Sequence, residues 1–146
     1  MDDPRDVVVI GGGQAGLACG YFLKRAGLRF AILDGEEKPG GAWLHAWDSL
    51  RLFSPAQWSS LPGWPMPAGP DGFPDRDAVI DYLARYEARY DLAVERPIEV
   101  TGVERRTNGF SIATSAGTRR ARAVISATGT WRHPFRPNYP DQDLFT

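Results

Sequence analysis

Residues 7–17 read VVVIGGGQAGL, and this stretch decides the fold. Its first four residues form a continuous β-branched run, which is typical of a strand buried on both faces of a parallel sheet. Gly11, Gly13 and Gly16 follow in the spacing G-x-G-x-x-G. Between a strand and a helix, Gly11 allows a tight turn, Gly13 lets the backbone approach a pyrophosphate, and Gly16 lets the helix pack closely on the sheet. The stretch therefore predicts the phosphate-binding turn of a dinucleotide site.

The helix after this turn completes the predicted phosphate site. Residues 17–26 carry apolar residues at helical spacing, and Gly27 is placed to end the helix as its C′ residue. The helix N-terminus offers unpaired N–H groups and the positive end of its dipole to a pyrophosphate. Gln14 and Ala15, at this N-terminus, join the three glycines among the predicted cofactor contacts.

A carboxylate stands at the end of the next predicted strand. Residues 30–33 form that strand, and Asp34 follows it. A carboxylate there can accept hydrogen bonds from both hydroxyls of a ribose, and its charge repels a 2′-phosphate. Gly35 beside it supplies no arginine for such a phosphate. The pattern favours FAD or NAD over NADP; the alternative interpretation is a glycine-rich turn beside a surface aspartate.

Residues 34–75 form an excursion rich in proline and tryptophan. Six of the 12 prolines and four of the five tryptophans lie between Trp43 and Pro74. Proline removes a backbone donor and restricts φ, so long regular elements are not expected there. The aromatic content is too high for a disordered linker. We therefore expect an ordered excursion that packs against the rest of the domain.

The second half of the chain returns to regular structure. A helix is predicted over residues 75–90 from its apolar stripe. A β-meander is predicted over residues 98–123, with turn residues that divide it into strands at 98–106, 109–114 and 119–123. Residues 123–128 then read as another buried parallel strand. The predicted fold class is α/β: a Rossmann-like parallel sheet with a βαβ nucleotide-binding unit and a three-stranded antiparallel β-meander.

Composition excludes several classes of function. The formal net charge is −1, without the basic stripe that a nucleic-acid surface needs. No apolar run approaches the roughly 20 residues of a membrane span. The acidic start MDDPRD is unlike a signal peptide, and the single cysteine, Cys19, fits a reducing compartment. We expect a cytoplasmic protein with no nucleic-acid partner, no membrane partner and no metal.

Five segments, in order, carry a resemblance to a known family. They are PGGAW, LRLFSPAQWSSLPGWPMP, FPDRDAVIDYLARYEARYDL, PIEVTGVER and ISATGTWRHPFRPNYP, beginning at residues 39, 50, 73, 97 and 125. The first resembles the Gly-Gly-x-Trp segment of flavin-containing and Baeyer–Villiger monooxygenases. The others resemble the loop, helix, meander and Ala-Thr-Gly strand of the same flavoproteins. The resemblance covers nearly the whole chain and implies that the dinucleotide is FAD.

The resemblance also assigns expected cofactor contacts. The Gly-Gly-x-Trp segment runs beside the diphosphate and the flavin in that family, and its tryptophan packs by the isoalloxazine. The adenine is held near the first strand of the meander, and a serine of the proline-rich loop is a candidate to face the flavin. In this sequence the implied contacts are Gly41, Ala42, Trp43, Ser54, Val100, Ala127, Thr128 and Gly129.

The implied function is that of an NAD(P)H-dependent flavoprotein oxidoreductase and, within that class, of a monooxygenase. Reduced flavin in that family reacts with O₂ to give a hydroperoxide, which oxygenates a soft or carbonyl small-molecule substrate. Complete enzymes carry a second glycine-rich turn for NADPH, and these 146 residues contain none. Phe145 and Thr146 match the first two positions of the fingerprint F-x-G-x-x-x-H. We expect residues 1–146 to be the N-terminal part of an FAD-binding domain, with a face able to self-associate or dock.

Two other functions stay open, and no catalytic residue is identified. One is a non-enzymatic module that binds the ADP part of FAD and needs a partner. The other is a fragment of an NAD-dependent dehydrogenase, which Asp34 alone would allow. Dithiol reductase chemistry is not expected from a chain with one cysteine. His45 and His133 lack an identifiable partner for proton transfer, and Trp47 fits a flavin wall or a hydrophobic cluster. The remaining aromatic residues interpreted as packing are Trp58, Trp64, Tyr82, Tyr86 and Tyr90.

Overall fold

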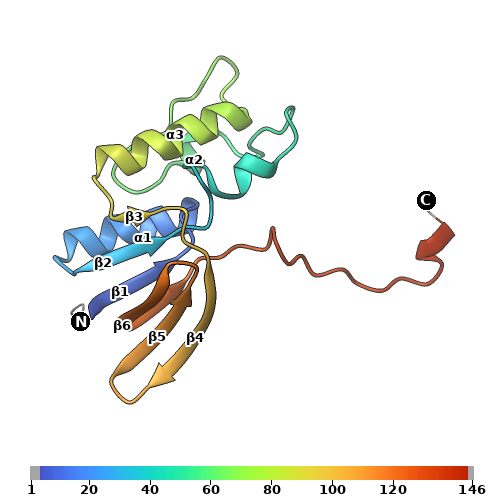
Figure 1. The fold of residues 1–146 in the computed structure, drawn as a ribbon. Helices are drawn as coiled ribbons and strands as arrows, with labels where there is room; N and C mark the ends of the chain where they lie inside the picture. The colour runs from blue at the N-terminus through green and yellow to red at the C-terminus, as the bar shows by residue number, and fades with distance from the viewer. Residues whose placement is uncertain (1–3, 145–146) are drawn as a thin grey trace.

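The computed structural model describes residues 4–144, which are built around one six-stranded sheet (Figure 1). The strand order is β3-β2-β1-β6-β5-β4. The strands are β1 Arg5–Ile10, β2 Phe30–Leu33, β3 Val94–Glu95, β4 Val100–Arg106, β5 Gly109–Thr114 and β6 Gly117–Ser126. The helices are α1 Gln14–Arg25, α2 Ala56–Ser59 and α3 Arg76–Arg89, with short 3-10 helices η1 Gly41–His45 and η2 Gln142–Leu144. The α/β class with a Rossmann-like sheet and a meander is confirmed.

The predicted βαβ unit is present as β1, α1 and β2. The strands β1 and β2 run parallel, in register from Val7 opposite Phe30 to Ile10 opposite Leu33. Helix α1 ends as expected, because Gly27 has a φ of +68° and its N–H donates to Lys24 O. The N–H of Leu28 donates to Leu23 O, which completes a Schellman motif. Local sequence signals therefore account for both ends of the crossover.

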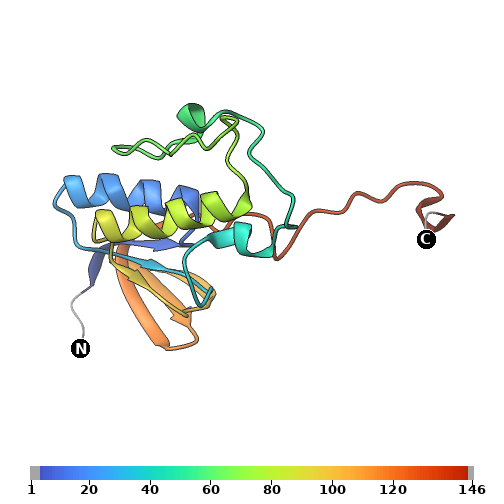
Figure 2. The same cartoon turned by 90° about the horizontal axis from the view of Figure 1, so that it is seen from above.

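Two hydrophobic layers cover the parallel strands. Val7 and Val9 of β1 face one side, where they pack with Leu17 of α1 and with the apolar stripe of α3. Val8 faces the other side and packs with Ile112 of β5. Figure 2 shows α1 and α3 side by side over the sheet, and the two helices are in contact. β1 is thus buried on both faces, as its β-branched run predicts.

The excursion packs on α3 through tyrosine hydroxyls. Tyr82 OH accepts a hydrogen bond from Leu61 N–H at 2.8 Å and donates one to Trp64 O at 2.7 Å. Tyr86 OH donates to Pro62 O at 2.6 Å. Burial raises the pKa of both tyrosines above the ordinary value. The packing roles expected for Trp64, Tyr82 and Tyr86 therefore agree with the structure, whereas Trp58 is 77% exposed, contrary to expectation.

The meander differs from the predicted division into strands. The segments expected at 119–123 and 123–128 form one continuous strand, β6. One edge of β6 pairs antiparallel with β5 through Gly117–Ala121, and the other pairs parallel with β1 through Ala121–Ser126. Because Ala121 pairs on both sides, no break separates the two segments. The short strand β3, which pairs with β2, was not predicted from the sequence.

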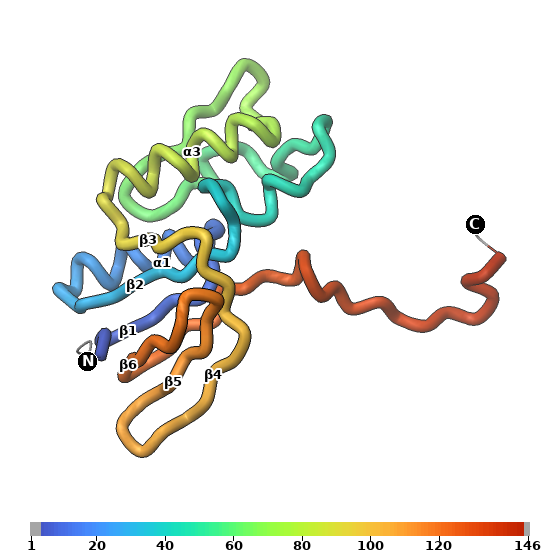
Figure 3. The backbone as a smooth tube through the Cα atoms, in the orientation of Figure 1, coloured from blue at the N-terminus to red at the C-terminus, as the bar shows by residue number. Residues whose placement is uncertain are grey.

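The segment after β6 leaves the body of the domain. Figure 3 shows it running away from the sheet to η2, so the two ends of the described chain lie far apart. Residues 129–144 are all exposed. Phe145 and Thr146, which match the start of the monooxygenase fingerprint, lie outside the described residues. Within residues 4–144, no helix is both long enough and apolar enough to cross a membrane.

Candidate functional site: a dinucleotide cradle at the carboxyl ends of the strands

The candidate site lies where β1, β2 and β6 end. β2 and β6 flank β1 on opposite sides, so the strand order reverses at β1. Ligands of doubly wound sheets bind outside the carboxyl ends of the strands at such a switch point. The glycine turn follows β1, Asp34 follows β2, and Ala127 follows β6. Three of the segments predicted from the sequence thus meet at one edge of the sheet.

The glycine turn has no room for side chains at two of its positions. A methyl carbon at Gly11 would lie 2.4 Å from Ala127 O, and Gly11 has a φ of +106°. A methyl carbon at Gly16 would lie 1.9 Å from Gly11 O. Helix α1 therefore packs directly on the turn, and the Ala127 segment packs on its other side. These contacts agree with the turn and packing tasks predicted for Gly11 and Gly16.

Gly13 is different, because the space above it is open. A methyl carbon at Gly13 would have its nearest neighbour, Gly41 Cα, at 4.0 Å. Gly13 is the N-cap of α1 and has no side-chain cap, and the first helical hydrogen bond runs from Leu17 N–H to Gly13 O. The N–H groups of Gln14, Ala15 and Gly16 precede that bond and have no partner within the helix. The turn is therefore an open cradle whose unpaired backbone donors suit a pyrophosphate.

The Gly-Gly-x-Trp segment docks on this cradle. A methyl carbon at Gly41 would lie 2.8 Å from Gly13 Cα, so the two backbones meet with no side chain between them. Trp43 Nε1 donates a hydrogen bond to Gln14 Oε1 at 3.1 Å. Gln14 and Trp43, which are 29 positions apart, thus bring two motifs together as one wall of the site, while Ala42 beside Trp43 is exposed. This pairing could not be read from either motif alone.

Asp34 is buried at the corner of the site, with 4% of the residue exposed. Its Oδ2 accepts a hydrogen bond from Arg96 Nε at 2.7 Å, and its Oδ1 lies 3.4 Å from Glu36 N. A methyl carbon at Gly12 would lie 2.5 Å from Oδ2, so the middle glycine of the turn makes room for the carboxylate. Neither Gly12 nor Arg96 stands in a sequence pattern that assigns it a role.

Arg96 ties Asp34 to helix α3. Its Nη1 donates to Glu87 Oε1 at 2.8 Å, and the arginine side chain is 10% exposed. Burial alone would lower the pKa of Arg96, but the hydrogen bonds to Glu87 and Asp34 outweigh it and leave the pKa raised. Among the described residues, Arg96 Nη2 and Glu87 Oε2 are buried without a hydrogen-bond partner. Arg96 therefore stays charged between two carboxylates.

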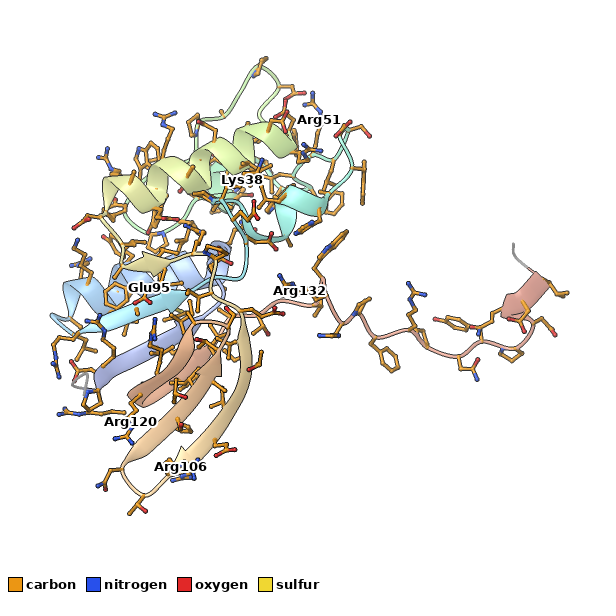
Figure 4. The ribbon with its side chains drawn as sticks, in the orientation of Figure 1. Lys38, Arg51, Glu95, Arg106, Arg120 and Arg132 are labelled. Atoms are coloured by element: carbon orange, nitrogen blue, oxygen red, sulfur yellow. The ribbon has the colours of Figure 1, made fainter. Side chains whose placement is uncertain are left out.

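Two arginines lie at this corner of the site, although Gly35, the residue after Asp34, supplies none. Arg96 pairs with Asp34, and the Arg132 guanidinium approaches Gly35, where a methyl carbon would lie 3.2 Å from Nη2. Arg132 also pairs with Glu99 at 2.8 Å, and Figure 4 shows it at the base of the C-terminal segment. Both arginines come from distant parts of the sequence, so adjacency to Gly35 did not reveal them. The repulsion of a 2′-phosphate by Asp34 is correspondingly weaker than the isolated carboxylate implied.

The outer corner of the site combines a histidine, a carboxylate and an indole. His45 Nε2 lies 2.8 Å from Glu36 Oε1, and the His45 ring stacks on Trp131 with centroids 5.7 Å apart. His45 therefore has partners that the sequence did not reveal. Trp47 is 62% exposed, so it does not belong to the hydrophobic core.

The remaining predicted contacts lie on segments outside the glycine turn. Ser54 is exposed and its hydroxyl pairs with that of Ser59 at 2.8 Å, within the excursion. Val100 packs beside Ile112 and the other residues under the meander. Ala127 N–H donates to Ile10 O at 2.8 Å, which holds the Ala-Thr-Gly segment beside the turn, and Thr128 and Gly129 that follow are exposed. Their contacts with a cofactor stay predictions.

The comparisons with known proteins agree with this geometry. The family described as "Pyridine nucleotide-disulphide oxidoreductase" matches residues 8–145. The chain belongs to this family. The flavin-containing monooxygenase of Stenotrophomonas maltophilia has a solved structure that is 56% identical, with a TM-score of 0.90 over 94% of this chain and 42% of that one. The resemblance to flavoprotein monooxygenases is therefore confirmed.

Two relatives are much longer than this chain, which matches only part of each. An uncharacterized CzcO-like oxidoreductase of Geobacillus kaustophilus is 38% identical over 93% of this chain and 39% of its own length. The indole-3-pyruvate monooxygenase YUCCA6 of Arabidopsis thaliana is 28% identical over 99% of this chain and 38% of its own length. The chain thus spans about two fifths of these relatives. As a member of this family it is related to flavin-dependent oxidoreductases, and flavin is the cofactor that its monooxygenase relatives indicate.

Proposed function

We propose that this chain forms the ADP-binding part of the FAD site of an NAD(P)H-dependent flavoprotein monooxygenase. The pyrophosphate would lie over Gly13, against the N–H groups at the start of α1. The adenosine ribose would lie at Asp34. The proposed contacts are those predicted from the sequence, with residues 1–146 as the N-terminal part of the FAD domain. The proposed compartment is the cytoplasm.

The observation that carries this proposal is the contact between Gly41 and Gly13. A glycine at each position lets the Gly-Gly-x-Trp segment lie against the phosphate turn, and the Trp43–Gln14 hydrogen bond holds it there. A site for NAD needs the turn and the ribose carboxylate. The additional wall supports a cofactor that extends past the pyrophosphate along this segment, as FAD does in the family that the sequence resembles.

FAD, once reduced by NADPH, would supply O₂ activation and oxygen transfer to a small soft or carbonyl substrate. The residues of this chain would bind and orient the cofactor. The helix N-terminus would stabilise the negative pyrophosphate, and the buried Asp34 would accept hydrogen bonds from the ribose. The indole of Trp43, held by Gln14, would limit solvent access where the cofactor extends past the pyrophosphate toward the flavin.

Calorimetry with the purified chain tests this proposal. FAD and ADP should both bind and should compete for one site, whereas FMN, which lacks the ADP half, should not displace either. NAD should bind more weakly than FAD, because it cannot use the Trp43 wall in the same way. Competition by FMN without competition by ADP would show that the cradle is not an ADP site. Tighter binding of NAD than of FAD would favour the dehydrogenase alternative.

A further inference from the structure

The arginine between Asp34 and Glu87 is the buried charged group that the proposed function leaves unexplained. Arg96 follows directly after β3, at the same edge of the sheet as Asp34. Its side chain is 10% exposed, and the side chains of Asp34 and Glu87 are 6% and 18% exposed. Removing three charges from water is costly, and a protein with apolar residues of similar volume in their place is often equally stable or more stable. Stability alone therefore does not account for this cluster.

Within this cluster, Arg96 is the residue that acts on the orientation of the Asp34 carboxylate. Arg96 Nε holds Oδ2 at 2.7 Å from one side. The backbone of Gly12 lies against the same oxygen, since even a methyl carbon there would come within 2.5 Å of it. Oδ2 is held between Arg96 and Gly12, while Oδ1 accepts a long hydrogen bond from Glu36 N–H at 3.4 Å and keeps the acceptor capacity that a ribose hydroxyl would use. Asp34 would then present one defined oxygen to a ribose, rather than a freely rotating carboxylate.

The unpartnered atoms are a second sign that the cluster is built for a ligand or for water. Arg96 Nη2 and Glu87 Oε2 are buried and, within residues 4–144, make no hydrogen bond. Buried polar atoms are nearly always paired in folded proteins. A structural ion pair optimised for stability would use these atoms as well. The guanidinium instead donates one hydrogen bond to one oxygen of each carboxylate.

We propose that Arg96 is a positioning residue of the nucleotide site, which aims Asp34 so that the site selects a ribose with a free 2′-hydroxyl. This role rests on the proposed function, because it requires a nucleotide at Asp34. A bare point charge would not substitute for the arginine, since the planar guanidinium engages two carboxylates at fixed angles. Glu87 holds the far side of the guanidinium and does not itself face the ribose subsite.

The test compares ADP with 2′-deoxy-ADP, by calorimetry on the whole 146-residue chain. The wild-type chain should prefer ADP by roughly tenfold or more, the usual scale for a hydrogen bond to a charged acceptor. Arg96→Met and Arg96→Lys should reduce this preference to about twofold, because the hydrogen bond to the 2′-hydroxyl loses its direction. Arg96→Lys keeps the charge and guards against a failure of the Met variant to fold. Glu87→Gln is the matched control, since it breaks an ion pair of the same arginine.

The outcomes separate the two hypotheses. Glu87→Gln should lower the melting temperature yet keep the full preference for ADP. If Arg96→Lys keeps the full preference for ADP over 2′-deoxy-ADP, Arg96 is only structural and the inference falls. The same conclusion follows if Glu87→Gln loses this preference in parallel with its melting temperature. If the folded wild-type chain binds neither ADP nor FAD, the proposed function falls first. If it binds both without preferring ADP to 2′-deoxy-ADP, the nucleotide site stands but the selection by Arg96 and Asp34 is refuted.

Discussion

Replacing Gly13 with alanine should weaken FAD binding while leaving the fold intact. The new methyl group has open space, because its nearest neighbour, Gly41 Cα, would lie at 4.0 Å. The backbone of Gly13 is extended, with a φ of −80°, which alanine also adopts. The cost of alanine at this N-cap is within about 1 kcal/mol. A pyrophosphate, however, must approach the backbone where the methyl group would stand. We expect binding to weaken by about 1–3 kcal/mol, the usual cost of overpacking.

Gly16→Ala is the matched variant, and we expect it to destabilise the fold. Its methyl carbon would lie 1.9 Å from Gly11 O, far inside the 3.0 Å below which neighbouring atoms must move. The obstacle is backbone, so α1 and the turn must separate. We expect a loss of about 1–3 kcal/mol or more in the free energy of unfolding. For a chain of this size the melting temperature should fall by roughly 2–4 °C for each kcal/mol.

Thermal unfolding by circular dichroism and FAD titration by calorimetry together decide the outcome. Gly13→Ala should melt close to the wild type and bind FAD roughly 5- to 150-fold more weakly. Gly16→Ala should melt clearly lower. Unchanged FAD affinity in Gly13→Ala would refute the assignment of the pyrophosphate to this turn. An unchanged melting temperature in Gly16→Ala would refute the inferred packing of α1 on the turn.

Three further predictions follow from the same geometry. Asp34→Ala should weaken ADP and FAD binding by about 1–3 kcal/mol in calorimetry, through lost hydrogen bonds to a charged acceptor; unchanged affinity would contradict the ribose assignment. Trp43→Phe should remove the bond to Gln14 and weaken FAD binding more than ADP binding; equal losses would place the indole away from the flavin side. The pKa of Tyr86 is raised by burial, so its contribution to stability is present at neutral pH and is lost as the pH rises above about 10, where the unfolded tyrosine ionises. In urea unfolding above about pH 10, the free energy of unfolding should fall less steeply with pH in Tyr86→Phe than in the wild type. Identical slopes in the two proteins would argue against this linkage.

Short-range patterns accounted for the first βαβ unit. The predicted strand at residues 30–33 coincides with β2, and the helix ends at Gly27 through a Schellman motif. These features depend on residues a few positions apart, such as a β-branched run or a glycine after an apolar stripe. Gly11 and Gly16 also fit their expected turn and packing tasks, because these tasks are set by local backbone geometry.

Strand boundaries that depend on distant partners were not predictable. β6 is one strand because β5 pairs with its first half and β1, at the other end of the sequence, pairs with its second half. β3 contains two residues, and its pairing with β2 joins positions about 60 apart in the sequence. Residues in such a strand carry almost no periodic signal of their own. Their conformation is decided by the neighbouring strand.

The sequence by itself determined that a glycine-rich turn and a carboxylate stand at the ends of successive strands, because strand, turn and helix propensities are local. Only the tertiary structure decided what surrounds that carboxylate. Arg96 lies 62 positions from Asp34 and reaches it through the pairing of β3 with β2. Gly41 likewise meets Gly13 only after the excursion folds back on the turn. Charges and backbones brought together by long-range pairing leave no spacing pattern in the sequence, and here they complete the proposed nucleotide site.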